Sequence, residues 1–143
     1  MIARLAREHN AWSHLDGAFG LWAAASPTLR GLVEGIAEAD SWATDAHKWL
    51  NVPYDCGVAI VRDRAAHTAA MNSFVGADYI PHPQHDERWE AEWVPEFSRR
   101  ARGFAVYAAL RALGRSGVAA LVERCSAGAR SASLATARMS PTR

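Results

Sequence analysis

The sequence predicts an α/β protein, because segments with strand and helix signatures alternate along its 143 residues. Three short segments, residues 11–16, 41–44 and 57–62, have the composition of strands. Between the first two, the stretch after Ser26 repeats large apolar residues at helical spacing. Strands joined through a helix pair in parallel, so we expect a parallel sheet with this crossover helix packed on it.

The elements of the first half follow in order from local signals. The chain opens on the last turns of a helix, whose apolar face is formed by Ile2, Leu5, Ala6 and His9. Residues 11–16 then form a short buried strand that ends in an Asp-Gly turn signal. Ser26 is the expected N-cap of the crossover helix and Pro27 its first residue. The face of that helix comprises Leu29, Leu32, Val33 and Ile36.

The second half is helical on either side of one long loop. Asp63 is expected to cap a short helix that runs through Met71. Residues 72–95 contain three prolines and a cluster of acidic residues, which predicts a loop of the length typical of lids and binding segments. A long helix then ends at Gly114, a second helical repeat runs to Cys125, and the small polar tail from Ser126 is expected to fray.

Composition excludes several classes of function. A net charge of +1 gives no reason to expect nucleic acid or an anionic membrane as partner. No apolar run reaches the roughly 18 residues of a transmembrane helix, and the N-terminus lacks the apolar core of a signal peptide. Cys56 and Cys125 are far apart in the sequence, and we expect both to be reduced and buried in a cytoplasmic protein.

Lysine usage singles out one residue. Of the 16 basic residues, Lys48 is the only lysine, and it lies in a segment flanked by Trp42 and Trp49. A need for an amine at that position would explain why a chain that avoids lysine elsewhere retains this one. Codon bias with one leftover lysine explains the count equally well.

Asp16 and Lys48 form the central constellation, with the lysine 32 residues after the aspartate. Asp16 closes the first predicted strand and Lys48 follows the second, so both should face the crevice at the carboxyl ends of the strands. An amine and a carboxylate there suit pyridoxal phosphate, which needs an amine for a Schiff base and a carboxylate at its ring nitrogen. A plain Asp–Lys salt bridge at a strand edge fits the same spacing.

Three sequence segments resemble the group II pyridoxal-phosphate-dependent decarboxylases, the family of the aromatic-L-amino-acid and glutamate decarboxylases. They are SHLDGAFG, ADSWATDAHKWLNVPYDCGVAIVRD and PEFSRRARGFAVYAALRALGRSGV, and the resemblance extends over residues 8–125. It implies a partial large domain of the fold type I transferases. Residues 1–98 would be the second half of that domain, with a mobile loop at 72–95. Residues 99–143 would be a connecting helix and the start of the small C-terminal domain.

The resemblance also implies roles for individual residues. Lys48 would be the Schiff-base lysine, and Asp16 would pair with the pyridine nitrogen of the cofactor. Ala18 would pack under the ring, where a small side chain leaves room. His47 would lie beside the lysine, close to the cofactor phosphate or the substrate carboxylate. Tyr79, in the loop, falls where the family places a tyrosine that returns a proton after CO2 leaves.

Two positions depart from the family pattern. Asp45 stands where common members have an asparagine near the phosphate, and a carboxylate there would repel a phosphate dianion. Thr44 or a water would then take over as phosphate ligand. Gly17 replaces an alanine between Asp16 and Ala18, a change that we expect to be mild.

The resemblance therefore implies pyridoxal-phosphate-dependent decarboxylation of an L-amino acid by a cytoplasmic homodimer. Two alternatives remain within the family: an aldehyde-forming relative, and a truncated, non-catalytic fragment. The isolated chain should be inactive, because the phosphate cradle and the ring-stacking residue come from the preceding half of the family's large domain. A metal-dependent hydrolase is a distant third. Its ligand groups, His14 with Asp16 and His82 with His85 and Asp86, are incomplete, so we expect no metal.

Overall fold

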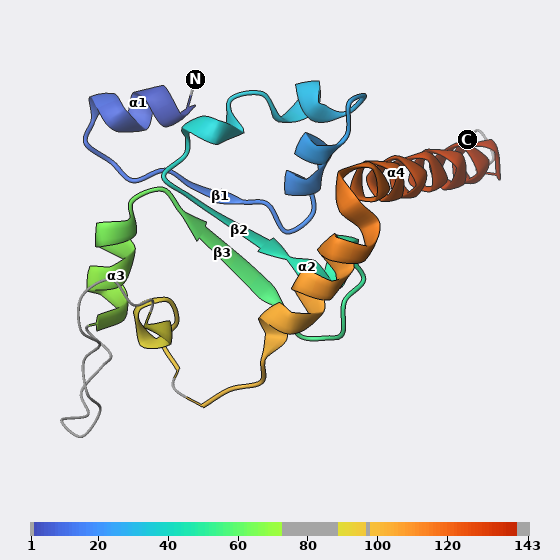
Figure 1. The fold of residues 1–143 in the computed structure, drawn as a ribbon. Coiled ribbons are helices and arrows are strands. Elements are labelled where there is room, and N and C mark those ends of the chain that lie inside the picture. The colour runs from blue at the N-terminus through green and yellow to red at the C-terminus, as the bar shows by residue number, and fades with distance from the viewer. Residues whose placement is uncertain (1, 73–88, 97, 140–143) are drawn as a thin grey trace.

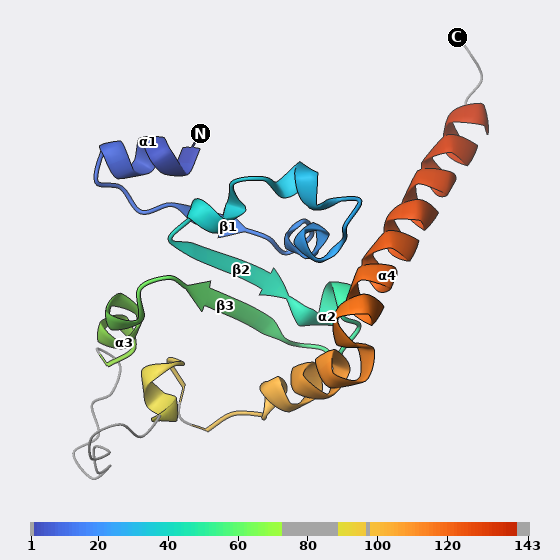
Figure 2. The same cartoon turned by 45° about the horizontal axis from the view of Figure 1, so that its top comes forward.

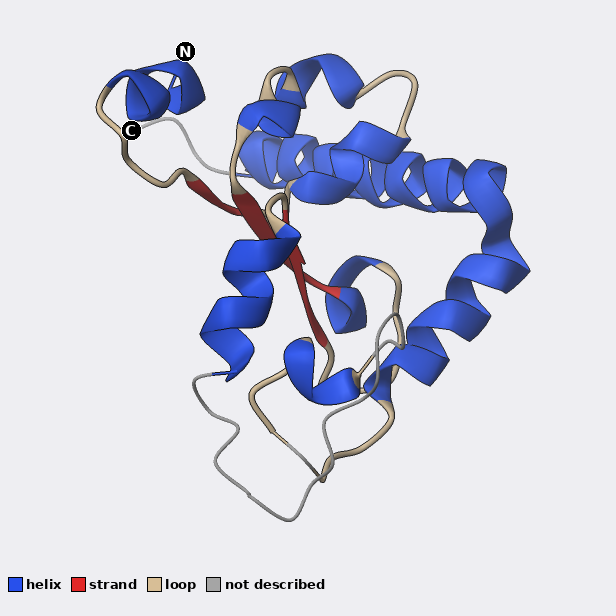
Figure 3. Cartoon of the chain, turned by 60° about the vertical axis from the view of Figure 1, so that its left-hand side comes forward, coloured by secondary structure: helices blue, strands red, loops and turns tan. Residues whose placement is uncertain are grey.

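A three-stranded sheet forms the centre of the protein. The computed structural model describes residues 2–72, 89–96 and 98–139. Its strands lie in the order β1 (His14–Asp16), β2 (Ser41–Asp45) and β3 (Gly57–Val61), as Figure 1 shows. Helical segments lie on both sides of these strands (Figure 3). The predicted α/β class is confirmed.

The expected parallel sheet is correct for only one strand pair. β1 runs parallel to β2, with Asp16 opposite Ala43, whereas β3 runs antiparallel to β2. The reason lies in the connections. A parallel pair needs a crossover of a dozen or more residues, which the segment between β1 and β2 provides. Only residues 46–56 join β2 to β3, and α2 (Ala46–Trp49) occupies part of them, so the chain turns back.

The crossover between β1 and β2 is not the single α-helix that the spacing predicted. It consists of three short 3-10 turns, η1 (Leu21–Ala25), η2 (Arg30–Val33) and η3 (Ile36–Glu38). Gly35 takes a left-handed conformation with φ 83°, which ends any helix at that point. The expected capping bond does form: the Ser26 hydroxyl oxygen accepts the N–H groups of Thr28 and Leu29, each at 3.2 Å.

The N-terminal elements match the prediction in kind but not in burial. α1 (Ile2–Glu8) is a helix, as expected. β1 is shorter than the predicted residues 11–16, and its outer residues are exposed, so the expected buried strand is wrong. Within the part of the chain that the structure describes, β1 pairs on one side only and forms an edge of the sheet.

The helices that follow β3 also combine confirmed and corrected predictions. α3 (Arg64–Asn72) begins at the expected cap, where the Asp63 carboxylate accepts the N–H groups of Ala65 and Ala66. Among the described residues that follow, Glu90–Glu92 form a 3-10 turn, η4, and α4 (Arg102–Met139) bends at the predicted Gly114. The tail from Ser126 stays helical to Met139 instead of fraying, which suits its many alanines.

α4 has two halves that lie differently against the sheet. The half before Gly114 runs along the lower part of the molecule, and the half after it packs on the core through Val118 before its later turns extend away from the sheet (Figure 2). By length and composition alone, the helix of residues 102–137 could cross a membrane, since an 18-residue window within it has a mean hydropathy of 1.3. Core helices of soluble proteins pass the same criterion, and Gly114 breaks this helix. The absence of a membrane partner stays a prediction.

The hydrophobic core lies directly beneath the end of β2 that leads into α2. It consists of Ala46, Leu50, Val52, Cys56 and Val118. The crossover is tied to α4 above this core, because the fully buried Ser26 hydroxyl donates to the Glu123 carboxylate at 2.7 Å. Both cysteines are free, as expected, and Cys56 is buried, but Cys125 is exposed on α4, contrary to prediction. The core therefore supports α2, the helix that carries Lys48.

Candidate functional site

The carboxyl ends of β1 and β2 bring the predicted amine and carboxylate to one end of the sheet. Asp16 ends β1 and Asp45 ends the parallel strand β2. α2 starts at once after Asp45 and carries Lys48 in its first turn. The Lys48 Nζ lies 4.3 Å from the centre of the Phe19 ring, and Phe19 follows Asp16 by three residues. The amine thus contacts a side chain of the segment that follows Asp16.

The turn after β1 is held in place by β2. The Asp16 Oδ1 accepts the N–H of Ala18 at 3.0 Å. Gly17 is buried, donates its N–H to the Ala43 carbonyl at 2.7 Å, and accepts the Thr44 hydroxyl at 3.1 Å. Three bonds therefore fix the backbone that positions the Asp16 carboxylate and Ala18.

Gly17 matters more than its sequence context indicated. A Cβ at this position would lie 2.6 Å from the Leu21 Cβ and 3.0 Å from the Ala43 carbonyl oxygen. Contacts this short force the turn to move away from β2. The expectation that this departure is mild does not hold for the geometry of this chain.

We expect Gly17→Ala to destabilise the chain by about 1–3 kcal/mol, the usual cost of overpacking a tight site. Urea unfolding followed by circular dichroism measures the change. Gly20→Ala is the matched control, since a Cβ at Gly20 meets nothing within 4 Å and its φ of −98° suits any residue. Equal midpoints for the two variants would contradict the tight fit at Gly17.

Thr44, the expected substitute phosphate ligand, is buried on β2 with 4% of its surface exposed. Its hydroxyl donates to the Gly17 carbonyl. In this arrangement Thr44 fixes the turn that carries Asp16. Its contact with a phosphate stays a prediction.

Lys48 and Asp45 form the closest ion pair of the site. Lys48 Nζ and Asp45 Oδ2 are 2.7 Å apart, and about a third of each side chain is exposed, 32% and 28%. The hydrogen bond from Lys48 holds the pKa of the Asp45 carboxyl below its usual range. Asp45 is thus a carboxylate at neutral pH and is the counter-ion of Lys48. The sequence identified Asp45 as a departure but not as the partner of the lysine.

His47 is anchored from below by the loop that leads into β3. Its Nδ1 accepts the N–H of Cys56 at 2.9 Å, and its ring lies 4.0 Å from the Tyr54 ring, centre to centre. His47 is half-buried, whereas the next residue, Lys48, is exposed. The predicted contact of His47 with the cofactor or substrate stays a prediction.

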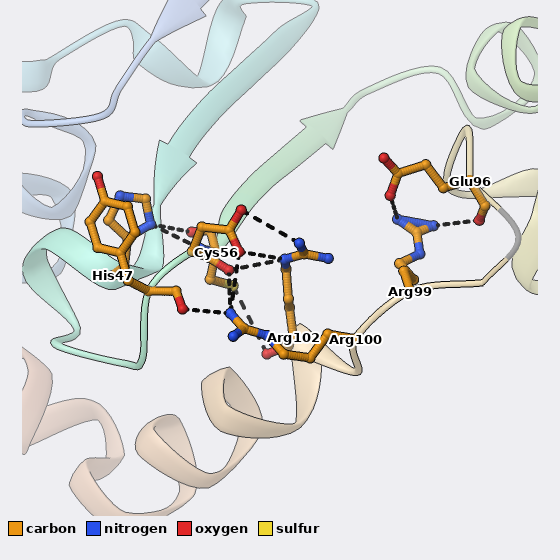
Figure 4. A network of polar contacts seen from close by, with 8 residues as sticks. His47, Cys56, Glu96, Arg99, Arg100 and Arg102 are labelled. Carbon is orange, nitrogen blue, oxygen red and sulfur yellow. Dashed lines mark hydrogen bonds and ion pairs between the residues drawn. The ribbon is translucent and has the colours of Figure 1, made fainter.

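Arg100 and Arg102 lie near His47 (Figure 4) and form a clamp on Asp55. Arg102 Nε donates to Asp55 Oδ1 at 3.0 Å, and Arg100 Nη2 contacts the same oxygen at 3.2 Å. Arg102 is the main cause of a lowered pKa of the Asp55 carboxyl. The sequence alone did not identify Asp55 as the partner of these arginines. The signal for it was an acidic residue in the tight turn before the third strand.

Other predicted residues lie apart from this site or outside the described residues. Tyr79, His82, His85 and Asp86 fall outside the described residues. His14 is exposed on β1, with its Nδ1 2.8 Å from the Ser41 hydroxyl. Among residues 2–72, 89–96 and 98–139, no group of three His, Cys, Asp or Glu side chains gathers as metal ligands.

A large cavity lies elsewhere in the molecule. It has a volume of about 1200 Å³ and opens between β3, α3 and the first turns of α4. Neither Asp16 nor Lys48 lines it. The assignment of the site therefore depends on the chemistry at the strand ends and not on the size of a cavity.

Comparison with known proteins gives consistent matches. The family model described as "Pyridoxal-dependent decarboxylase conserved domain" matches residues 1–138. Tyrosine/DOPA decarboxylase 2 of Papaver somniferum is 30% identical over 116 residues, covering 79% of this chain and 22% of the relative. L-2,4-diaminobutyrate decarboxylase of Rhizobium meliloti (strain 1021) is 36% identical over 125 residues, covering 85% and 24%.

Solved structures show the same likeness. Mouse CSAD superposes with a TM-score of 0.68 at 25% identity, covering 90% of this chain and 26% of that structure. Oryza sativa TDC with PLP and tryptamine gives a TM-score of 0.72 at 25% identity, covering 82% and 24%. The chain thus spans about a quarter of the length of the proteins that it matches, between 22% and 26% in these four.

Proposed function

The chain belongs to the family of pyridoxal-dependent decarboxylases, and from this premise we propose that it supplies the cofactor-holding segment of an enzyme that decarboxylates an L-amino acid. One observation carries the proposal: the only lysine of the chain follows the end of β2, and its amine contacts the ring of Phe19, three residues after Asp16 at the end of the parallel strand β1. Relatives named as tyrosine/DOPA and L-2,4-diaminobutyrate decarboxylases support it.

The residues at the strand ends fit pyridoxal phosphate. Lys48 supplies an amine on a partly exposed side chain, and the cofactor aldehyde requires an amine. Within the described part of the chain, Asp16 Oδ1 accepts one N–H and Oδ2 has no hydrogen-bond partner. The carboxylate can therefore accept a hydrogen bond from the protonated ring nitrogen of the cofactor. Ala18, next in the turn, offers a small, half-buried side chain. These three residues would hold the aldehyde carbon, the nitrogen and one face of the ring.

The protein residues then act on a bound amino acid in distinct ways. Pyridoxal phosphate supplies an electron-accepting ring that takes up the charge left when the carboxylate departs as CO2. Asp16 keeps a proton on the ring nitrogen, which maintains that capacity. Lys48 would hold the cofactor through Nζ. His47, anchored at Nδ1 by Cys56, offers Nε2 beside the lysine.

Asp45 affects how readily pyridoxal phosphate can bind to Lys48. An ammonium paired with a carboxylate at 2.7 Å is not a nucleophile until it gives up its proton. The same carboxylate repels a phosphate that approaches the end of β2. We propose that Asp45 slows attachment of the cofactor to Lys48 and excludes the phosphate from its immediate surroundings.

The test measures release of CO2 by the full-length gene product. The substrates are aromatic, acidic and 2,4-diamino L-amino acids labelled at the carboxyl group. We expect release that depends on added pyridoxal phosphate and disappears in Lys48→Ala. The absence of release from every substrate in that panel would reject decarboxylation and favour the alternative of a non-catalytic chain. The 143-residue chain alone should release none, since it covers only a quarter of its relatives.

An aldehyde-forming reaction is the second candidate, because Rhodiola rosea 4-hydroxyphenylacetaldehyde synthase is among the similar structures, with a TM-score of 0.62 at 27% identity. Such a reaction consumes O2 and water and yields aldehyde, CO2, ammonia and hydrogen peroxide. Assays for ammonia and peroxide alongside CO2 separate it from simple decarboxylation, which leaves the amine.

We also propose that the protein is a cytoplasmic homodimer whose domains meet near residue 98. Free thiols at Cys56 and Cys125 suit a reducing compartment. Phe104 and Tyr107 expose 78% and 63% of their surfaces on α4, which suits contact with further protein. Analytical ultracentrifugation and cell fractionation test the assembly and the compartment.

A further inference from the structure

The turn that follows α2, the helix that carries Lys48, is bound by arginines at the start of α4. The turn comprises residues 54–56, between α2 and β3. Arg100 Nη2 donates to the Tyr54 carbonyl at 2.6 Å and to the Asp55 carbonyl at 3.1 Å, and Arg102 Nε donates to the Asp55 carbonyl at 3.0 Å. Both guanidinium groups also reach the Asp55 carboxylate (Figure 4). Two cations thus converge on one turn.

The same turn determines the surroundings of His47. The Cys56 N–H lies 2.9 Å from Nδ1, and the Cys56 carbonyl lies 3.2 Å from it. A backbone N–H can only donate, so Nδ1 accepts and the neutral ring carries its proton on Nε2. The Cys56 carbonyl already has a donor, the Ala46 N–H at 2.9 Å. The backbone position of Cys56 therefore selects the tautomer of His47.

We propose that Asp55 is a positioning residue for this site: held by Arg100 and Arg102, it fixes residues 54–56 so that Cys56 keeps Nδ1 of His47 occupied and leaves Nε2 as the proton-bearing nitrogen. The functional meaning of this arrangement depends on the proposed function, because His47 immediately precedes the cofactor lysine. The arrangement itself is a property of the chain without cofactor. It can therefore be measured whether or not decarboxylation is found.

Asp55 does not hold the turn by burial. Its side chain is 61% exposed, and exposed ion pairs add little to overall stability. Removing the carboxylate should therefore leave the fold in place and loosen only the turn. Cys56, 97% buried at the core, keeps the strand that follows anchored. This separation between local geometry and global stability makes the proposal testable.

The experiment measures acylation of each histidine by diethylpyrocarbonate, which reacts at the lone-pair nitrogen of a neutral imidazole. Mass spectrometry of peptides gives the rate for each histidine. In Asp55→Ala the rate at His47 should rise about threefold to tenfold, the factor expected when one ordinary hydrogen bond is released. His9, on an exposed N-terminal turn, and His67, which contacts the Trp93 carbonyl from α3, serve as internal references.

Two further variants complete the test. Glu38→Ala is the matched control, because it removes a comparably exposed carboxylate that pairs with Arg7 far from His47, and it should leave the His47 rate unchanged. Arg102→Ala should raise the rate, and Arg102→Lys should restore most of the protection. An unchanged His47 rate in Asp55→Ala, or an equal rise at all three histidines, would overturn the proposal.

Discussion

Pyridoxal phosphate followed by borohydride should label this chain at Lys48 and at no other side chain. Lys48 is the only lysine, so no other side-chain amine can compete. Its side chain is partly exposed, and its amine lies over the Phe19 ring. Digestion with trypsin, which cleaves after Arg30 and Arg62, places the expected label in the peptide of residues 31–62. Lys48→Ala should abolish this labelling completely.

A second variant distinguishes a specific site from a merely accessible amine. Asp45→Asn removes the counter-ion of Lys48 and the charge that repels a phosphate. Labelling should then be retained and should become faster at neutral pH. Glu8→Gln, which removes an exposed pair with Arg4, should leave the rate unchanged. A label found mainly on the N-terminal amine, or equal rates in Asp45→Asn and the parent chain, would contradict this account of the site.

Local signals predicted the elements whose structure is decided by a few neighbouring residues. β2 and β3 lie within one residue of their predicted bounds, and Asp63 caps α3 as expected. Gly114 ends a helical stretch because its backbone takes the non-helical φ of 61°, which glycine adopts easily. These features depend on strand composition, a cap and a glycine, all of which are visible in the sequence.

Other features depend on geometry that spacing does not encode. The apolar repeat of the crossover fitted a helix, but Gly31 and Gly35 allow separate turns, and Leu32 is 80% exposed. The direction of β3 follows from the short connection through α2, not from the strand residues themselves. Sequence spacing therefore identified the elements better than it identified their arrangement.

The candidate site likewise contains residues that the sequence identified and contacts that only the fold shows. Asp16 and Lys48 were found because their residue types and order suit one chemistry. The pairing of Lys48 with Asp45 and the clamp of Arg100 and Arg102 on Asp55 were not found, because they depend on side-chain directions at the end of β2 and on a contact between segments some 45 residues apart. Opposite charges are common in any sequence, and only the fold selects which of them meet.

Asp16→Asn should leave the protein able to bind pyridoxal phosphate but should lower kcat by on the order of a hundredfold or more, about 3 kcal/mol. The asparagine oxygen can still accept the Ala18 N–H that Asp16 accepts at 3.0 Å, so the turn after β1 should keep its shape. Lys48 lies on a different element, α2, and keeps its amine. What the variant loses is the negative charge that keeps a proton on the ring nitrogen, and that proton allows the ring to accept electrons as CO2 leaves.

The measurement compares kcat, KM and pyridoxal phosphate affinity in the protein as its gene encodes it. Asp63→Asn is the matched control, because asparagine caps a helix about as well as aspartate and α3 carries none of the predicted site residues. Loss of kcat with cofactor affinity preserved separates the role of the charge from unfolding, since an unfolded protein would lose both. A kcat within twofold of the parent enzyme would mean that Asp16 serves the turn through its bond to Ala18 and takes no part in the reaction.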